Sequence, residues 1–307
     1  MSAKTIALYA FTAVLAAPGA AYAVDQVQIG DQKVFPESIT STADGTLYAG
    51  SMPLGQVFKA APGAETTELL IDRPTEGPAA VLGVYADEAA KTLWVCYSDP
   101  AAFSGSPDAA PAQVKAYDLG TADLKASYNL EKGSFCNDIA TTADGAAYVA
   151  DTTNGSVMRL KPGADALDVW VKDAALAGVD GLSFGPDGAL YVNSVTTGKL
   201  FRITMGADGA AGAITELTLS EPLKGPDGMR FGDDGKLYVA QNGAGRVDAV
   251  TIDGDTATAT VSKLKDGFDM PTAVTKVGDT LWVLEAKFSK MQEADPGLFY
   301  AYAVKLQ

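Results

Sequence analysis

Residues 187–192 read Asp-Gly-Ala-Leu-Tyr-Val, and closely similar stretches return along most of the chain. In each copy a Leu or Ala, an aromatic residue and a Val or Ala follow one another. The copies begin at Leu47, Leu93, Ala147, Leu190, Leu237 and Leu281. Successive copies are 46, 54, 43, 47 and 44 residues apart, a period typical of the blades of a β-propeller.

Four copies follow an Asp-Gly pair, which begins at Asp44, Asp144, Asp187 and Asp234. Asp-Gly between two β-rich runs is a strong signal of a tight hairpin. Each unit therefore reads as strand, turn, strand and further strands, without helical periodicity between units. The sequence predicts an all-β fold over residues 24–307, a six-bladed β-propeller with four-stranded antiparallel blades around a central channel. We expect 24–29 to pair with 299–306 and so complete the last blade.

The first 23 residues differ from the repeats. Lys4 precedes a mostly apolar run over 5–17, and Ala21-Tyr22-Ala23 follows it. This order is typical of a cleaved secretory signal, and the run is shorter than the ~20 apolar residues of a membrane-spanning helix. We therefore expect residues 1–23 to be removed and the mature protein to be periplasmic or secreted, with no membrane attachment.

Composition narrows the partners and the chemistry. The formal net charge is −15, which disfavours nucleic acids and anionic membranes as partners. The expected partner is a small-molecule substrate, and the oligomeric state is left open. The chain has no histidine, so catalysis must use carboxylates, lysine, tyrosine or a metal held by oxygen. The only cysteines are Cys96 and Cys136. Export would permit a disulfide between them, and two buried thiols are the alternative.

Alignment of the six units exposes a polar column ten residues before each triplet. In units one, three, four and five it holds Glu37, Asn137, Asp180 and Asp227. In units two and six the equivalents are Val81 or Leu82 and Pro271 or Thr272. The column begins the strand expected to line the channel, so its oxygen atoms would converge on one axis. Converging carboxylates either protonate or bind a hard cation, and oxygen ligands suit Ca²⁺, Mg²⁺ or Mn²⁺. The alternative role is capping of backbone amides.

A second polar column lies four residues after the start of each triplet. It holds Ser51, Tyr97, Asp151, Ser194, Gln241 and Glu285. Because the second strand of a hairpin runs antiparallel to the first, this column should end on the same face as the expected ligands. We expect it to border a substrate pocket, with Tyr97, Asp151, Gln241 and Glu285 as lining residues. Solvated strand ends are the alternative.

Four short motifs carry a resemblance to a known family. They are Phe-Pro-Glu-Ser-Ile at 35–39, Cys-Asn-Asp-Ile at 136–139, Val-Asp-Gly-Leu at 179–182 and Pro-Asp-Gly-Met at 226–229. In these motifs the chain resembles the senescence marker protein/gluconolactonase-like propellers, whose wider relatives include paraoxonases, diisopropyl fluorophosphatase and strictosidine-synthase-like proteins. The resemblance spans essentially the whole chain after residue 23.

The resemblance implies roles for single residues. Glu37, Asn137, Asp180 and Asp227 would hold one catalytic divalent ion, with Asp180 in place of the family's usual Asn and Asp227 as base or nucleophile. Asp138 matches an Asp that helps to hold a second, structural calcium in paraoxonase-like members. Phe135 stands where gluconolactonase-type members carry an Arg that binds a polar sugar, which favours a less polar substrate and places Phe135 in the substrate pocket.

Together these features favour a metal-dependent hydrolase of a lactone or related ester. Ca²⁺ is the expected cation, with Mg²⁺, Mn²⁺ and Zn²⁺ as alternatives. A non-catalytic, exported binding or scaffold propeller with a structural calcium is the second hypothesis, because propellers host many functions. The acid at Asp227 favours catalysis, since a purely structural site would be served equally by Asn.

Overall fold

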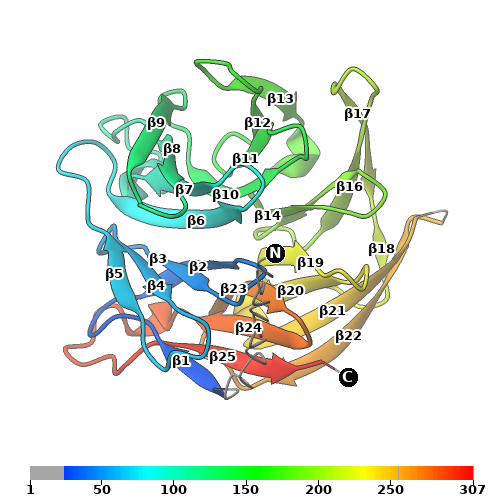
Figure 1. The fold of residues 1–307 in the computed structure, drawn as a ribbon. Coiled ribbons are helices and arrows are strands. Elements are labelled where there is room, and N and C mark those ends of the chain that lie inside the picture. Colours follow the sequence, from blue (N-terminus) through cyan, green and yellow to red (C-terminus); the bar gives the residue numbers. More distant parts are fainter. Residues whose placement is uncertain (1–23, 255, 307) are drawn as a thin grey trace, which may run out of the picture.

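Six β-sheets surround a central axis in the computed structural model, which describes residues 24–254 and 256–306 (Figure 1). Each sheet contains four antiparallel strands that follow one another from the axis outward, and one sheet has an additional short strand. This arrangement confirms the predicted six-bladed propeller. Residues 1–23, the expected export signal, lie outside the described residues. Within the described part, none of the helices has the length and hydropathy that crossing a membrane requires.

Blades are numbered in chain order. Blade one contains β2 (Pro36–Ser41), β3 (Leu47–Ser51), β4 (Val57–Ala60) and β5 (Glu68–Ile71), and blade two contains β6 (Ala80–Asp87), β7 (Thr92–Ser98), β8 (Gln113–Asp118) and β9 (Leu124–Asn129). Blade three contains β10 (Cys136–Thr141), β11 (Ala147–Asp151), β12 (Ser156–Leu160) and β13 (Asp168–Lys172), and blade four contains β14 (Val179–Phe184), β15 (Leu190–Ser194), β16 (Leu200–Met205) and β17 (Ala211–Glu216). Blade five contains β19 (Pro226–Phe231), β20 (Leu237–Gln241), β21 (Arg246–Asp253) and β22 (Thr258–Asp266), with β18 (Thr218–Leu219) parallel to β22. Blade six contains β23 (Pro271–Val277), β24 (Thr280–Glu285), β25 (Tyr300–Lys305) and β1 (Gln26–Gln28).

Both ends of the described chain complete blade six. β1 pairs antiparallel with β25, with Val27 opposite Ala301. This is the predicted pairing of 24–29 with 299–306, and it is confirmed. Without β1 the outer edge of β25 would lack a partner, so the pairing both closes the ring and covers a sheet edge.

The predicted Asp-Gly hairpins connect innermost strands to second strands. Gly45, Gly145 and Gly188 have φ angles of +93°, +89° and +74°, a conformation that glycine adopts without steric cost. The preceding aspartate stabilises the turn, since the Asp44 carboxylate accepts the Thr46 amide at 2.9 Å. These turns fix the register of the first two strands in their blades.

The aromatic residue of each triplet fills the space between blades. Tyr148 of β11 packs edge-on against Trp170 of its own blade and Phe184 of the next, with ring centroids 5.0 and 5.1 Å apart. Tyr191 packs in the same way against Phe231 of blade five at 5.0 Å. The repeat is therefore conspicuous in sequence because every interface between blades needs a large planar side chain at this point.

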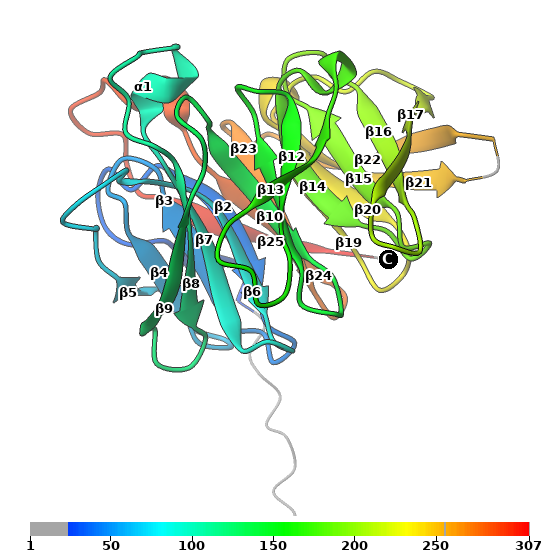
Figure 2. The ribbon, with the colours of Figure 1, turned by 90° about the horizontal axis from the view of Figure 1, so that it is seen from above.

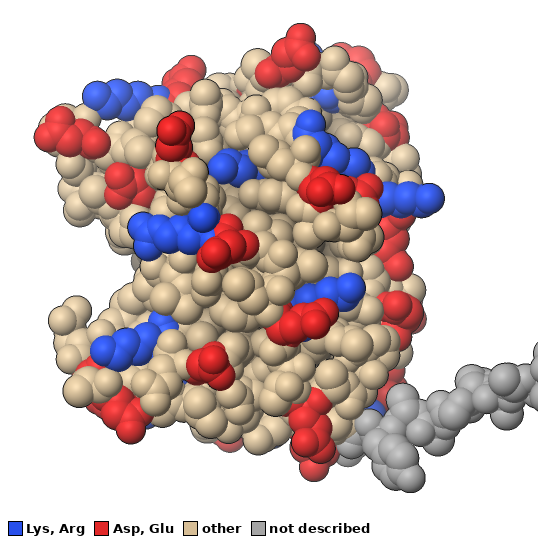
Figure 3. Space-filling view, turned by 60° about the vertical axis from the view of Figure 1, so that its left-hand side comes forward, with Lys and Arg blue, Asp and Glu red and all other residues tan. Residues whose placement is uncertain are grey.

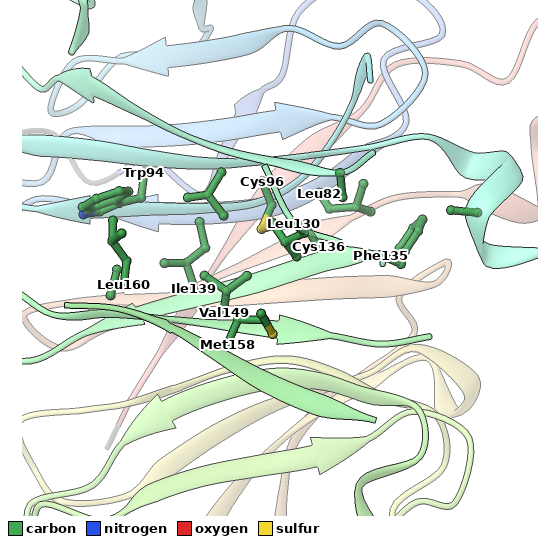
Figure 4. Packing of buried hydrophobic residues seen from close by; sticks show 14 of the residues in the cluster. Leu82, Trp94, Cys96, Leu130, Phe135, Cys136, Ile139, Val149, Met158 and Leu160 are labelled. Carbon is green, nitrogen blue, oxygen red and sulfur yellow. A yellow bond between two sulfur atoms is a disulfide. The ribbon is translucent and has the colours of Figure 1, made fainter. Parts of the chain in front are cut away.

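Blades two and three share a core that includes the two cysteines (Figure 4). Cys96 of β7 and Cys136 of β10 form a disulfide whose Cα atoms are 5.4 Å apart. The bond ties two neighbouring blades together beside the innermost strand β10. Phe135 lies at one end of this cluster, next to Leu82 (Figure 4).

The short helices lie at one end of the blades. They are α1 (Pro100–Phe103), η1 (Ala174–Leu176), η2 (Asn242–Ala244) and η3 (Phe288–Lys290). They follow second strands or, for η1, precede an innermost strand. Second strands end where innermost strands begin, so all four share one face, which we call the entry face; α1 stands on it in Figure 2.

Charged side chains of both signs are interspersed over the flank shown in Figure 3. The negative net charge therefore does not gather into one patch on this flank. The acidic groups that carry the functional argument are instead buried near the axis.

Candidate metal centre

Each innermost strand contains one extra residue near its start. In blade three, Cys136 pairs with Asp151 and Ile139 with Val149, so Asn137 and Asp138 stand opposite a single residue. The same irregularity occurs in all six innermost strands of the described chain. β-Bulges of this kind change the direction of the side chains that they contain. The bulge explains why the predicted ligand column faces the axis although it lies inside a strand.

All four predicted ligands lie in these bulges and are buried. Glu37, Asn137, Asp180 and Asp227 are only 6–8% exposed. The Asn137 side-chain amide donates a hydrogen bond to Asp180 Oδ2 at 2.9 Å, which joins neighbouring blades three and four. The structure thus brings the predicted column together at the entry end of the channel. In blades two and six the bulges contain Leu82 and Thr272, which agrees with the expected equivalents.

Ionisation of the three carboxyl groups in this ring is unfavourable. Burial, followed by repulsion from Asp180, raises the pKa of Glu37 well above its usual value. Burial, followed by repulsion from Asp180 and Glu37, raises the pKa of Asp227 in the same way. The pKa of Asp180 itself rises to about 7, because of burial first and then the charge of Asp138. Burial and mutual repulsion therefore favour the neutral forms of these carboxyl groups, and a bound cation would favour their charged forms.

One oxygen of the ring lacks a partner. Asp180 Oδ1 is buried and accepts no hydrogen bond within the described chain, whereas Asp227 Oδ1 accepts the Gly228 amide at 2.9 Å. Buried polar atoms normally have a partner, and an exception often marks the place of an ion or water. The orphaned oxygen, the acidic ring and the absence of nitrogen or sulfur ligands fit a hard divalent cation.

The ring is not a preformed cage. Among residues 24–254 and 256–306, no three acidic, cysteine or histidine side chains already stand together as a metal-binding group. Asn137 presents its NH₂ group to Asp180, and half a turn of the amide would present its oxygen instead. The four residues are therefore a candidate centre whose side chains must adjust to bind an ion.

A second asparagine holds the backbone of this ring in place. Asn193 of β15 is fully buried; it donates to the Asp227 carbonyl at 2.6 Å and accepts the Gly181 amide at 3.2 Å. It thereby fixes the distance between the bulges of blades four and five. Neither Asn193 nor Asn242, whose side chain lies 3.4 Å from Asp227 Oδ2, belongs to a repeated column, so no pattern in the sequence singled them out.

Asp138 has a different role from the expected one. Both its carboxylate oxygens contact the guanidinium of Arg230, at 2.6 and 2.7 Å, and they also accept the amides of Ile139 and Leu182. The residue that follows the axial position turns toward the next blade instead of the axis. This saturated site does not fit the second, structural calcium that the resemblance implies, because a cationic side chain already compensates the charge.

The members of the second polar column are buried. Tyr97 is fully buried between blades one and two, and its hydroxyl lies 3.3 Å from that of Tyr117. The other members bond the segment that leads into the innermost strand of their own blade. Asp151 accepts the Phe135 amide, Gln241 the Lys224 amide, Glu285 the Asp269 amide, and Ser51 and Ser194 donate to the Val34 and Ala177 carbonyls. These contacts give Asp151, Gln241 and Glu285 a structural role, since buried backbone groups at these entries need partners; the substrate-pocket role expected for them and for Tyr97 stays a prediction.

Phe135, which the resemblance places in the substrate pocket, is buried in the core shared by blades two and three, and its pocket role stays a prediction. It precedes Asn137 by two residues, is buried, and packs edge-on against Phe103 with ring centroids 5.3 Å apart. Phe103 belongs to α1, in an insertion between β7 and β8. The 54-residue spacing between the second and third triplets signalled extra residues there, but not their position beside Phe135.

Solved structures with the same fold carry several functions. An allergen of Malassezia sympodialis, Mala s 1, has a TM-score of 0.72 and 14% identity over 92% of this chain and 96% of its own. A gluconolactonase of Xanthomonas campestris has a TM-score of 0.63 and 20% identity over 89% and 87%. A calcium-binding protein of Agrobacterium tumefaciens, regucalcin, has a TM-score of 0.63 and 20% identity over 92% and 95%. At these identities the likeness shows the fold alone.

Sequence comparison gives the family. No curated protein matches the chain at a significant level. The model of the SMP-30/gluconolactonase/LRE-like region matches residues 35–286, a segment that contains all six innermost strands and all four candidate ligands. Because this match covers well over half of the chain, the protein belongs to the SMP-30/gluconolactonase/LRE-like family.

Proposed function

We propose that this protein is a divalent-cation-dependent hydrolase of a lactone or related ester, with Ca²⁺ as the preferred ion. One observation carries the proposal: a buried ring of three carboxyl groups and one amide, in which Asp180 Oδ1 has no partner within the described chain. No member of the ring carries a positive charge. Ionisation of its buried carboxyl groups therefore costs free energy, and a bound cation would offset that cost. Membership of a family that includes gluconolactonases supports the reaction class.

In this proposal Glu37, Asn137, Asp180 and Asp227 hold the ion. The bound cation would supply polarisation of the substrate carbonyl and stabilisation of the developing oxyanion. Four protein ligands leave positions for water and substrate in the 6–8-fold shell that Ca²⁺ adopts. Mg²⁺, Mn²⁺ and Zn²⁺ remain alternatives.

Asp227 is the proposed base or nucleophile. Its Oδ1 accepts the Gly228 amide, its Oδ2 lies 3.4 Å from the Asn242 side chain, and its carboxyl group also shares a hydrogen bond with Asp180, so the base or nucleophile would have to leave that contact with Asp180. As a base it would take a proton from the attacking water and return it to the alcohol oxygen that leaves as the C–O bond breaks. As a nucleophile it would attack the carbonyl carbon and expel that oxygen, and water would then hydrolyse the acyl group from Asp227. Because the chain has no histidine, a histidine base is excluded.

The surroundings of the ring support a substrate less polar than a sugar lactone. Phe135 and Leu82 form an apolar boundary on the side of blades two and three. We further propose that the substrate is a small molecule met outside the cytoplasm, in the periplasm or after secretion. The expected export signal at 1–23 and the Cys96–Cys136 disulfide support this location, because disulfides persist in oxidising compartments.

Metal analysis with activity measurements tests the proposal. Purified protein is analysed for bound metals, treated with EDTA, and assayed on a panel of lactones and aryl esters before and after Ca²⁺, Mg²⁺, Mn²⁺ or Zn²⁺ is returned. We expect EDTA to abolish hydrolysis and one cation to restore it. Absence of both bound metal and cation-dependent thermal stabilisation would favour the non-catalytic binding or scaffold protein instead.

A single substitution separates catalysis from metal binding. Asp227→Asn should abolish turnover and retain most of the cation-dependent stabilisation, because Asn still offers one oxygen ligand. Asp144→Asn is the matched control, since Asp144 is an exposed acid in the blade-three hairpin. Hydrolysis by Asp227→Asn at the wild-type rate would refute the assigned role of Asp227.

A further inference from the structure

A cavity of about 690 Å³ opens on the entry face, between segments of blades two, three and four. Its walls come from the α1 insertion, from the turn at 132–133, from the loop 152–154 and from the entry to blade four at 177–178. Glycine, alanine, threonine and one phenylalanine make up most of its lining, which also includes Lys132, Asn154, Ser106 and Pro107. The volume lies within the range of about 300–1,000 Å³ that small-molecule sites occupy, and the mechanism above does not use it.

Phe103 is the apolar wall of this cavity. Its side chain is 60% exposed, yet its ring rests edge-on against the buried ring of Phe135. An isolated exposed phenylalanine needs no explanation. One that lines a cavity and is supported by a second aromatic ring offers a ready contact for an apolar group.

Hydrogen bonds and a disulfide hold the α1 insertion, which contains Phe103, in place. The two carboxylate oxygens of Asp99 accept the amides of Ala101 and Ala110, at 2.9 and 3.0 Å, and so close the insertion on itself. Below it, the Cys96–Cys136 disulfide joins the strand that leads into the insertion to the strand that follows Phe135. Such support on both sides is what a site needs to select a ligand shape.

The cavity lies within reach of the ligand ring. Gly178 lines the cavity and Asp180 follows two residues later, so their Cα atoms are at most about 7 Å apart. Gly133 lines the cavity and precedes Asn137 by four residues, which allows at most about 14 Å. A chain of roughly six to ten carbon atoms spans these distances.

We propose that this cavity, the Phe103 pocket, binds the apolar arm of a lactone or ester whose carbonyl lies at the candidate metal centre. The inference rests on the proposed function and names its substrate class: lactones or esters with an alkyl or aryl arm of about six to ten carbons. Phe103 is then a specificity-determining residue. It contacts the arm and does not take part in the bond cleavage.

Arm length is the variable to test by kinetics. kcat/KM is measured for γ-valerolactone, which has a methyl arm, and for γ-dodecalactone, which has an octyl arm. We expect a higher value for the octyl substrate. Phe103→Ala should lower it about tenfold, the effect of losing ~50 Å² of apolar contact at ~25 cal/mol per Å², and leave the methyl substrate unchanged.

Two further variants test whether the effect of Phe103→Ala comes from the cavity. Ser106→Trp places a large side chain in the cavity and should also lower kcat/KM for the octyl substrate alone. Leu124→Ala is the matched control, because Leu124 is 56% exposed on the outer strand β9 of the same blade. Equal effects of Phe103→Ala on both substrates would refute the pocket while the proposed hydrolase stands.

Binding without hydrolysis separates the two proposals. Affinities for 2-methylcyclopentanone and 2-octylcyclopentanone, ketones that cannot be hydrolysed, are measured by calorimetry on wild type and Phe103→Ala. Tighter binding of the octyl ketone that Phe103→Ala abolishes supports the pocket even if no lactone is hydrolysed. Equal affinity for both ketones overturns it. Sedimentation that shows a dimer of wild type and a monomer of Phe103→Ala would assign Phe103 to a protein interface and also overturn it.

Discussion

Arg230→Met is expected to destabilise the propeller because Arg230 is the buried counter-ion of Asp138. The guanidinium contacts both carboxylate oxygens, and the two side chains are only 12% and 5% exposed. The same guanidinium donates to the carbonyls of Leu182 and Met229, at 3.1 and 2.7 Å. Because Asp138 lies in blade three and Arg230 in blade five, the pair spans blade four and connects three innermost strands.

The magnitude of the loss depends on this burial. Removing one partner of a buried ion pair costs about 3–5 kcal/mol, because the other charge remains without compensation. In Arg230→Met the carboxylate of Asp138 keeps only the amides of Ile139 and Leu182. In the double variant with Asp138→Leu neither charge is buried, so we expect a loss of about 2 kcal/mol or less. Two independent losses would instead sum to about 8 kcal/mol.

Urea denaturation of the four proteins of this cycle, in EDTA at pH 7, measures the coupling. Arg202→Met is the control, since Arg202 pairs with Asp187 at 2.7 Å but the two side chains are 25% and 34% exposed; it should cost less than about 1 kcal/mol. A single-variant loss below about 1 kcal/mol, or additive losses in the double variant, would refute the view that Arg230 compensates Asp138.

Three further predictions concern the disulfide, the acidic ring and its backbone. Replacing Cys96 and Cys136 with Ala should lower the free energy of unfolding by about 4 kcal/mol, since the bond closes a loop whose ends are 40 residues apart; an unchanged melting temperature in calorimetry would contradict this. The metal-free protein should lose stability as pH rises from about 4 through 7, because the folded state keeps a proton on Asp180, whose pKa is raised to about 7, after the unfolded state has released it. Saturating Ca²⁺ should flatten that dependence in denaturation curves, and a metal-free protein whose stability rises over this range would contradict the assignment. Gly181→Ala should weaken Ca²⁺ binding about tenfold or more in calorimetry, because its Cβ would overlap the Asp227 carbonyl oxygen, while the exposed-turn variant Gly120→Ala should not.

The fold and the position of the axial ring were predictable because both arise from local features that recur from blade to blade. The Asp-Gly turns fix the hairpin register, and the aromatic triplet marks each blade interface, so residues ten positions before the triplet are equivalent. The second polar column was harder to interpret. A polar residue that recurs in each blade shows only that a polar group nearby needs a hydrogen-bond partner, not which group that is. For Asp151 and Glu285 that partner is a backbone amide of the preceding segment. No local rule indicates that Asp138 meets Arg230, 92 residues away.

The bulge that aims a ligand at the axis also constrains the next residue in the sequence. That residue is turned into the narrow space against the following blade. There Gly83, Gly181 and Gly228 leave no room for a Cβ beside the backbones of residues 137–138, 227–229 and 272–273. Ser38 fits because its hydroxyl accepts the Val84 amide of the next blade.

Asp138 is the charged member of this series. A carboxylate in that space is stable only with a cation close by, and in this chain Arg230 supplies it. Among the described residues the neighbouring axial carboxyl groups have no such ion pair: Arg230 pairs with Asp138 and only partly offsets the raised pKa of Glu37, and Asp180 Oδ1 has no partner. The same β-bulge therefore yields a carboxylate that is satisfied from within the chain and, one residue earlier in the strand, the axial ring for which we propose a bound cation.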